Sequence, residues 1–167
     1  MKLSVEDRFE IQDLLARYCM ALDTKNFDEF VNVMTDDVEW DYSDEFDEPL
    51  YGREAATETI RKSLEPHPAS LHVALYNLAW ATGPDTAEGY SQVLSKSVLD
   101  GAPLPARPET TFEVFCRWHD SYVRTDEGWR IKKRKLAVWA TSGDPEVWDP
   151  DTIAGKAFRG LMPSSRD

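Results

Sequence analysis

The chain of 167 residues contains only two cysteines, Cys19 and Cys116, in different predicted elements. Neither forms a CxxC pair or has a histidine at ligand spacing, so we expect free thiols and no zinc site. The sequence also lacks a Gly-rich phosphate loop, a nucleophile elbow and an HExxH motif. These absences remove the usual signatures of nucleotide binding, serine hydrolysis and zinc proteolysis.

Long apolar runs are missing as well. No stretch approaches the roughly 20 apolar residues that cross a bilayer, and residues 1–8 lack the apolar run of a signal peptide. We therefore expect a soluble, cytoplasmic protein. The 19 basic residues are outnumbered by 31 acidic ones, which gives a net charge of −12. Because such a surface repels phosphate backbones and anionic lipids, we expect neither nucleic acid nor membrane as a partner.

An acidic run at residues 41–48 is the one place where metal binding could be suspected. It lacks the Asp-x-Asp-x-Asp-Gly pattern of a calcium loop and the distal glutamate that completes it. We therefore interpret the run as a solvated loop, which could form a rim over a cavity mouth, and expect no metal.

The first predicted helix covers roughly residues 5–22. Ser4, followed three residues later by Asp7, resembles a helix start, and apolar residues then recur at intervals of three and four. Asn26, with Glu29 three residues on, indicates the start of a short second helix. A single compact domain is expected at this length.

Strand patterns dominate the rest of the chain. A first strand alternates at Val38, Trp40 and Tyr42, and a third helix opens near Gly52 and ends before Pro66. Four long runs follow, separated by turn residues, at 71–82, 87–99, 111–125 and 129–141. Short turns between long strands indicate antiparallel pairing, so we predict an α+β fold with three helices before a curved, mostly antiparallel sheet.

The chain divides into a domain at 1–142 and a tail at 143–167. The tail is interrupted by prolines and glycines, and one short helix is expected around 154–161. We expect that this tail could cover the mouth of a cavity.

Several segments occur in an order typical of a known family: Arg17–Asp23, Phe27–Asp28, Gly52–Ala55, Ser70–His72, Asp120–Arg124 and Gly128–Ile131. In this order the sequence resembles the SnoaL-like branch of the NTF2-like superfamily over about residues 5–140. The resemblance implies a cone, or α+β barrel, in which a bent sheet wraps around the first helix. It leaves the activity open, because the fold hosts dehydratases, isomerases, cyclases, dehydrochlorinases and binding subunits.

The resemblance also implies site residues. Tyr18, Asp23 and His72 are placed like the Tyr, Asp and His of bile acid 7α-dehydratases, and scytalone dehydratase is of the same type. The pair Asp23 and His72 is also similar to the dyad of hexachlorocyclohexane dehydrochlorinase. Arg134 falls near the strand arginine of the dehydratase pattern. Related dehydratases have a titratable residue near Ser95, and because of this departure from the pattern their substrate does not carry over directly to this chain.

These residues predict a proton-transfer site. His72 would act as general base on an acidic C–H while Asp23 holds its other ring nitrogen, and Tyr18 would polarise a carbonyl or protonate a leaving oxygen. An organic substrate would then need no cofactor. The expected cavity wall is formed by Trp40, Tyr42, Tyr76 and Ser95.

Structural roles for the same residues remain open. His72 could be a core histidine, Asp23 could cap the end of the helix, and Tyr18 lies on the apolar stripe. Five helical positions also rotate by about 140°, which does not place Tyr18 and Asp23 on one face. Arg134 stands in a run of charged residues, 130–135, of the kind that usually marks a solvated strand face.

Three functions therefore remain. The leading hypothesis is a cofactor-independent lyase of the dehydratase type, acting on a hydrophobic, oxygenated small molecule through an Asp-His dyad. An isomerase or a polyketide-cyclase-like enzyme would use the same dyad, and a ligand-binding or assembly module would perform no chemistry. Four aromatic residues predict a homo-oligomer, either dimer or trimer, if they lie on an uncovered sheet face: Trp118, Tyr122, Trp129 and Trp139.

Overall fold

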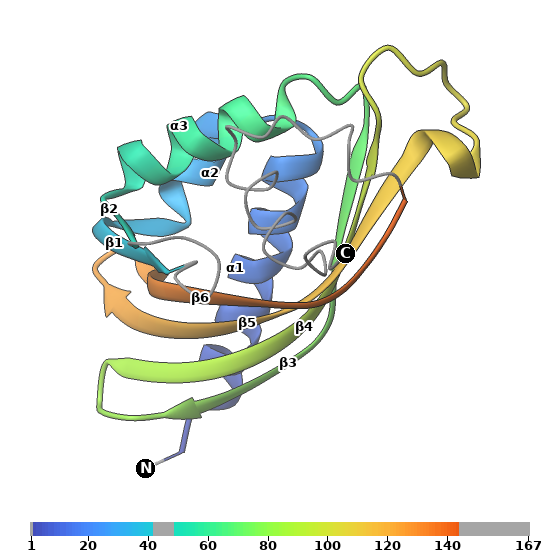
Figure 1. Ribbon diagram of the computed structural model, residues 1–167. Coiled ribbons are helices and arrows are strands. Elements are labelled where there is room, and N and C mark those ends of the chain that lie inside the picture. Colours follow the sequence, from blue (N-terminus) through green and yellow to red (C-terminus); the bar gives the residue numbers. More distant parts are fainter. Residues whose placement is uncertain (1, 42–48, 144–167) are drawn as a thin grey trace, which may run out of the picture.

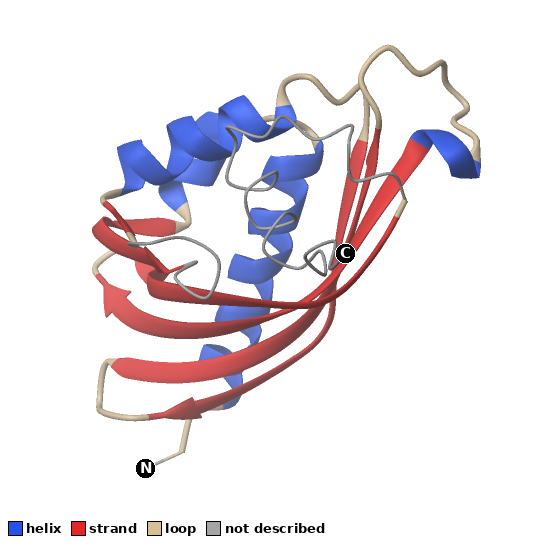
Figure 2. Ribbon diagram, viewed as in Figure 1, coloured by secondary structure: helices blue, strands red, loops and turns tan. Residues whose placement is uncertain are grey.

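The computed structural model describes residues 2–41 and 49–143. Three helices pack against a curved, unclosed sheet of six strands, and α1 runs along the concave side (Figures 1 and 2). The helical segments are α1 (Val5–Asp23), α2 (Phe27–Asn32), α3 (Arg53–Leu64) and the short η1 (Pro108–Thr110). The strands are β1 (Met34–Asp41), β2 (Leu50–Tyr51), β3 (Ser70–Ala81), β4 (Thr86–Val98), β5 (Thr111–Thr125) and β6 (Gly128–Ser142).

The predicted α+β class and the order of the main elements are confirmed. The sheet order is β2-β1-β6-β5-β4-β3, and β3 to β6 form an antiparallel meander. One pairing is parallel, since β1 lies beside β6 and makes the sheet mixed. The helix predicted around 154–161 and the proposed role of the tail lie outside the described residues.

The start of α1 is fixed by the predicted cap. Ser4 Oγ accepts the backbone N–H of Asp7 over 3.0 Å, and the Asp7 carboxylate accepts the backbone N–H of Ser4 over 3.1 Å. The same carboxylate accepts bonds from the Arg124 guanidinium and, over 3.1 Å, from the indole N–H of Trp129. One side chain therefore caps α1 and ties it to β5 and β6.

The end of α1 is held against the segment that enters β3. Lys25, in the left-handed region at φ 54°, donates from Nζ to the carbonyl oxygens of His67, over 2.7 Å, and of Glu65, over 3.1 Å. Thr24 Oγ1 donates back to the carbonyl of Met20 over 2.7 Å. These bonds place the last residue of α1 beside the first residues of β3.

The prediction that four aromatic residues lie on an uncovered sheet face is wrong for three of them, because those three are buried. Trp118, Tyr122 and Trp129 are 3%, 1% and 2% exposed and belong to the core between α1 and the sheet. Strand alternation explains this, because Trp118 and Tyr122 share the inner face of β5 with other core residues. Only Trp139 of the four is exposed. The homo-oligomer prediction therefore needs other residues.

A β-bulge changes the faces of β3. The register with β4 shifts between Ala74 and Tyr76, so the strand has one extra residue there. Ala74 packs toward the core before the bulge, and Asn77 bonds to the buried Ser91 after it. Tyr76 consequently points to the outer face, where it is exposed and bonds to Gln92.

Candidate functional site

Asp23 and His72 meet where the end of α1 touches β3. The ring Nδ1 of His72 lies 2.7 Å from Oδ1 of Asp23, and the backbone N–H of His72 donates to Oδ2 over 3.0 Å. One carboxylate thus binds both the ring and the main chain of a residue 49 positions away. These two hydrogen bonds fix the imidazole relative to the strand.

The two bonds also explain why the carboxylate lies there. β3 is an edge strand, and an unpaired backbone N–H at an edge needs a partner. Asp23 supplies it at one end, while Arg8 donates to the carbonyl of Ala79 over 3.4 Å toward the other end. Side chains of α1 therefore cover polar groups of β3, and the catalytic candidate is part of this cover.

The geometry sets the tautomer of the imidazole. A carboxylate accepts only, so Nδ1 carries the hydrogen toward Asp23 and Nε2 holds a lone pair in the neutral ring. No described residue bonds to Nε2. The side chains of His72 and Asp23 are 12% and 18% exposed, so the dyad is largely enclosed and still accessible. Such a pair can accept a proton at Nε2 and stabilise the resulting cation.

Arg134 lies in a second polar group, inside the core. Its Nε and Nη2 donate to the two oxygens of Asp120 over 2.7 and 2.6 Å, and both side chains are fully buried. The Tyr122 hydroxyl also donates to Asp120, over 3.0 Å. Burial alone would lower the pKa of Arg134, but the Asp120 charge outweighs it and raises that pKa above the ordinary arginine value. Arg134 therefore stays charged.

Aromatic rings enclose this guanidinium. Its central carbon lies 3.8 Å from the ring centre of Trp118, 4.2 Å from that of Tyr18 and 5.6 Å from that of Trp40. Among the described residues, its Nη1 has no hydrogen-bond partner. Burial raises the pKa of Tyr18, and the Arg134 charge opposes the rise. Tyr18 is thus a neutral phenol that can donate a hydrogen bond.

The four predicted catalytic residues are therefore divided into two pairs, Asp23 with His72 and Tyr18 with Arg134. Arg134 does not lie on a solvated strand face, because its side chain points inward while Lys133 points to an ion pair with Glu39. Sequence reasoning missed Asp120 as the partner of Arg134. The signal was present, since Asp120 is a charged residue at an inward, otherwise apolar position of β5.

The four expected cavity residues have four different outcomes. Ser95 lies directly opposite His72 in the β3–β4 register. Trp40 is 1% exposed and packs in the aromatic cluster around Arg134. Tyr76 is a correction, because the bulge in β3 turns it to the outer face, where it is 56% exposed. Tyr42 lies outside the described residues.

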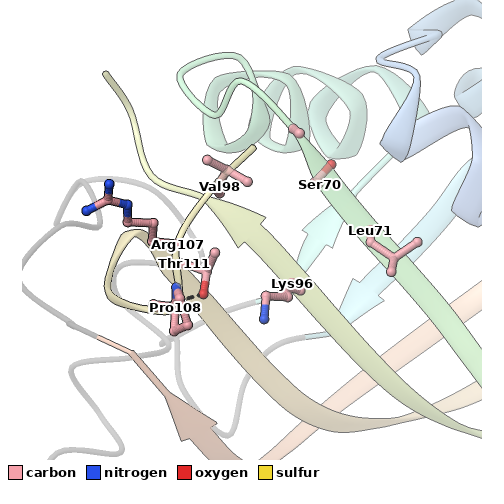
Figure 3. Close-up of a pocket in the computed structure, with 9 residues that line it drawn as sticks. Ser70, Leu71, Lys96, Val98, Arg107, Pro108 and Thr111 are labelled. Atoms are coloured by element: carbon pink, nitrogen blue, oxygen red, sulfur yellow. Dashed lines mark hydrogen bonds between the residues drawn. The ribbon is translucent and has the colours of Figure 1, made fainter. Parts of the chain in front are cut away.

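Two of the hollows that described residues line do not include the dyad. One of about 280 Å³ lies where β3, β4 and the start of β5 meet the loop before η1, with Leu71, Lys96 and Pro108 in its wall (Figure 3). The other, of about 380 Å³, lies along α1 and the start of α2. In the described ranges there is no cluster of three or more potential metal ligands, and no helix there could span a membrane.

Comparison with known proteins gives one family and one group of relatives. A family model described as a SnoaL-like domain matches residues 3–135. An uncharacterized protein of Mycobacterium tuberculosis is 32% identical over 136 residues, which cover 78% of this chain and 84% of that protein. The name of that relative states no activity, so it suggests no reaction for this chain.

Solved structures share the fold at lower identity. A candidate scytalone dehydratase from Novosphingobium aromaticivorans has a TM-score of 0.73 and 20% identity, covering 84% of this chain and 89% of that one. A candidate aromatic ring hydroxylase from the same organism has 0.72 and 23%, covering 86% and 97%. Hexachlorocyclohexane dehydrochlorinase from Novosphingobium barchaimii has 0.68 and 16%, covering 83% and 90%. The names differ, so the fold alone does not assign a reaction.

Proposed function

The chain belongs to the SnoaL-like domain family, and on that premise we propose that it is a cofactor-independent lyase of the dehydratase type. Its substrate would be a hydrophobic, oxygenated small molecule. The observation that carries the proposal is the 2.7 Å hydrogen bond that Nδ1 of His72 donates to Asp23, which leaves Nε2 unbonded among the described residues. Two structural neighbours bear the names of elimination enzymes, which agrees with this proposal.

The reaction follows from the tautomer. Nε2 of His72 takes a proton from an acidic carbon, and the electrons of that C–H bond form the new double bond. The C–O bond at the β carbon breaks, and its electron pair leaves with the oxygen. The imidazolium, stabilised by Asp23, returns its proton to that oxygen, so that water departs and the dyad is restored. A positioned acid or base of this kind contributes about 10²- to 10⁴-fold.

Tyr18 and Arg134 would stabilise negative charge in the same reaction. Nη1 of Arg134 is a buried donor without a partner in the described part of the chain, and the Tyr18 phenol packs directly on the guanidinium. A ligand oxygen that reached them would accept one hydrogen bond from the charged guanidinium and one from the neutral phenol. Their burial makes this role secondary to that of the dyad.

A β-hydroxyketone tests the elimination directly. 3-Hydroxy-1-tetralone loses water to give fluorescent 1-naphthol, and we expect the protein to accelerate this conversion. Asp23→Ala and His72→Gln should each reduce the rate by about 100-fold or more, because the base is lost or no longer held. His119→Gln is the matched control, since His119 lies on the outer face of β5, stacked on Tyr90. Equal rates in His72→Gln and His119→Gln would refute the role of the dyad.

Isomerisation or cyclisation is the second candidate, because the same dyad can move a proton without a leaving group. Exchange of the α-hydrogens of 1-tetralone in D₂O, followed by NMR, detects proton abstraction alone. Exchange without naphthol formation would favour an isomerase or cyclase. Binding without exchange would instead favour a ligand-binding module.

A further inference from the structure

Three serines lie beside His72 on the inner face of the sheet. In the register of β3 and β4, His72 is opposite Ser95, and Ser70 is opposite Ser97. Residues two apart on a strand point to the same face, so Ser70 accompanies His72, and Ser95 and Ser97 accompany the fully buried Ser91. We call Ser70, Ser95 and Ser97 the serine block.

Among the described residues, the hydroxyls of the serine block have no hydrogen-bond partners. The Oγ of Ser70 is buried and bonds to no residue in the described part of the chain. Within residues 2–41 and 49–143, no hydrogen bond is made by the other two hydroxyls, nor by Nε2 of His72. The next polar pair along the same strands is satisfied, because Asn77 Nδ2 donates to Ser91 Oγ over 3.1 Å. The unpartnered Ser70 hydroxyl therefore lies two residues from the imidazole, on the same strand.

This arrangement has an energetic cost unless something binds there. The cost falls on the Ser70 hydroxyl, which is buried without a partner among the described residues, and a ligand oxygen can remove it by forming a hydrogen bond there. Side chains directly opposite on paired strands have Cβ atoms about 4.5–5.5 Å apart. At that separation Nε2 of His72 can face a C–H while Ser95 bonds to an oxygen on a neighbouring carbon. Ser95 is only half-buried, which makes it the accessible member of the block.

We infer that Ser95, supported by Ser70 and Ser97, binds a carbonyl or hydroxyl oxygen of the substrate next to the carbon that His72 deprotonates. The inference rests on the proposed function and narrows the substrate class to ketones and hydroxyketones. A halogenated hydrocarbon would leave the three hydroxyls without partners. Ser95 would then determine specificity, because a site built to bond an oxygen rejects an analogue that lacks it.

The test compares 1-tetralone with tetralin, which has the same carbon skeleton and no oxygen. Dissociation constants for both are measured by NMR titration with the full chain. The unmodified protein should bind 1-tetralone more tightly. Ser95→Ala should raise the dissociation constant of 1-tetralone by up to about tenfold, the range of one hydrogen bond, and leave that of tetralin unchanged. Ser95→Thr, which keeps a hydroxyl, should retain the preference, and Ser121→Ala on the outer face should change neither constant.

Several results would overturn the inference. One is an equal loss of affinity for both ligands in Ser95→Ala, and another is no loss of affinity for either. A third is that the unmodified protein does not prefer 1-tetralone to tetralin, or does not bind it up to the solubility limit. The D₂O exchange of 1-tetralone separates this failure from failure of the proposed function. Exchange without oxygen preference refutes the serine block alone, whereas oxygen preference without exchange upholds the block as an oxygen-binding site and refutes the lyase.

Discussion

At the scale of single residues, each carboxylate of the site accepts hydrogen bonds from two different donor groups. Asp23 accepts from the ring and the backbone of His72, and Asp120 accepts two bonds from Arg134 and one from Tyr122. The difference is solvent access, since the first pair is partly exposed and the second is fully buried. The first can exchange protons with a ligand, and the second stays fixed in charge.

Arg134→Met should therefore destabilise the fold strongly. The change leaves the buried Asp120 carboxylate without its counter-charge, and losing one partner of a buried pair costs about 3–5 kcal/mol. Replacing both partners in Asp120→Leu/Arg134→Met should recover most of that loss, because no charge is then buried alone. Urea unfolding at pH 7 measures both. Lys133→Met is the control on the same strand, where the ion pair is more exposed and about 1 kcal/mol or less is expected.

A loss below about 1 kcal/mol for Arg134→Met would contradict this account of the buried pair. A double variant as unstable as the single one would show that the surrounding aromatic rings, rather than the charge pair, require the guanidinium. In that case the contacts with Tyr18 and Trp118 would be the main contribution.

At the scale of elements, the sequence predicted most boundaries because apolar period and turn residues agree along the chain. Ser4 and Asp7 form the predicted cap, and the four long strands fall where the turn residues delimit them. Local periodicity does not determine which strands pair across the sheet. The parallel pairing of β1 with β6 could therefore not be derived from the sequence. The bulge in β3 is likewise invisible in the pattern, and for that reason Tyr76 was expected on the wrong face.

The site was predictable to different depths for a related reason. Spacing alone cannot bring Asp23 to a residue 49 positions away, and the family resemblance suggested that pair. The separation of Tyr18 from Asp23 was foreseeable, because five helical positions rotate the two side chains apart. The partner of Arg134 depends on the β5–β6 register, in which Asp120 stands directly opposite.

Asp7 gives a prediction about how α1 is attached to the sheet. Burial raises the pKa of Asp7, but bonds from Arg124, Trp129 and Ser4 outweigh it and lower the pKa from 3.8 to about 2. A carboxylate with a lowered folded-state pKa stabilises the fold above its unfolded value, and this contribution is lost as the pH falls from about 4 toward 2. Asp7→Asn should thus cost about 2 kcal/mol at pH 7.

The pH dependence separates this effect from a general defect of the helix. The difference in unfolding free energy between the unmodified protein and Asp7→Asn should shrink as the pH is lowered from 4 to 2. Asp13→Asn, an exposed position of the same helix, should show no such change. If the Asp7→Asn difference stayed constant down to pH 2, the ionised carboxylate would not be what ties α1 to β5 and β6.

At the scale of the whole molecule, the outer face of β3 is unusually apolar for a surface. Four exposed side chains lie along this one edge strand: Leu71, Leu75, Tyr76 and Leu78. Contiguous apolar surface of this kind usually marks an interaction site. The net charge of −12 opposes association of two copies, because they repel each other at low ionic strength.

We therefore expect a homo-oligomer that forms through the outer face of β3 and is favoured by salt. Sedimentation at 20 and 300 mM NaCl should show a larger associated fraction at the higher salt, since screening weakens the repulsion while apolar burial remains. Leu78→Glu should give a monomer, because it places a charge in the apolar face. Met20→Glu, an equally exposed position on α1, should associate as before. A monomer at both salt concentrations would contradict the prediction, whereas association that survives Leu78→Glu would place the interface on another part of the molecule.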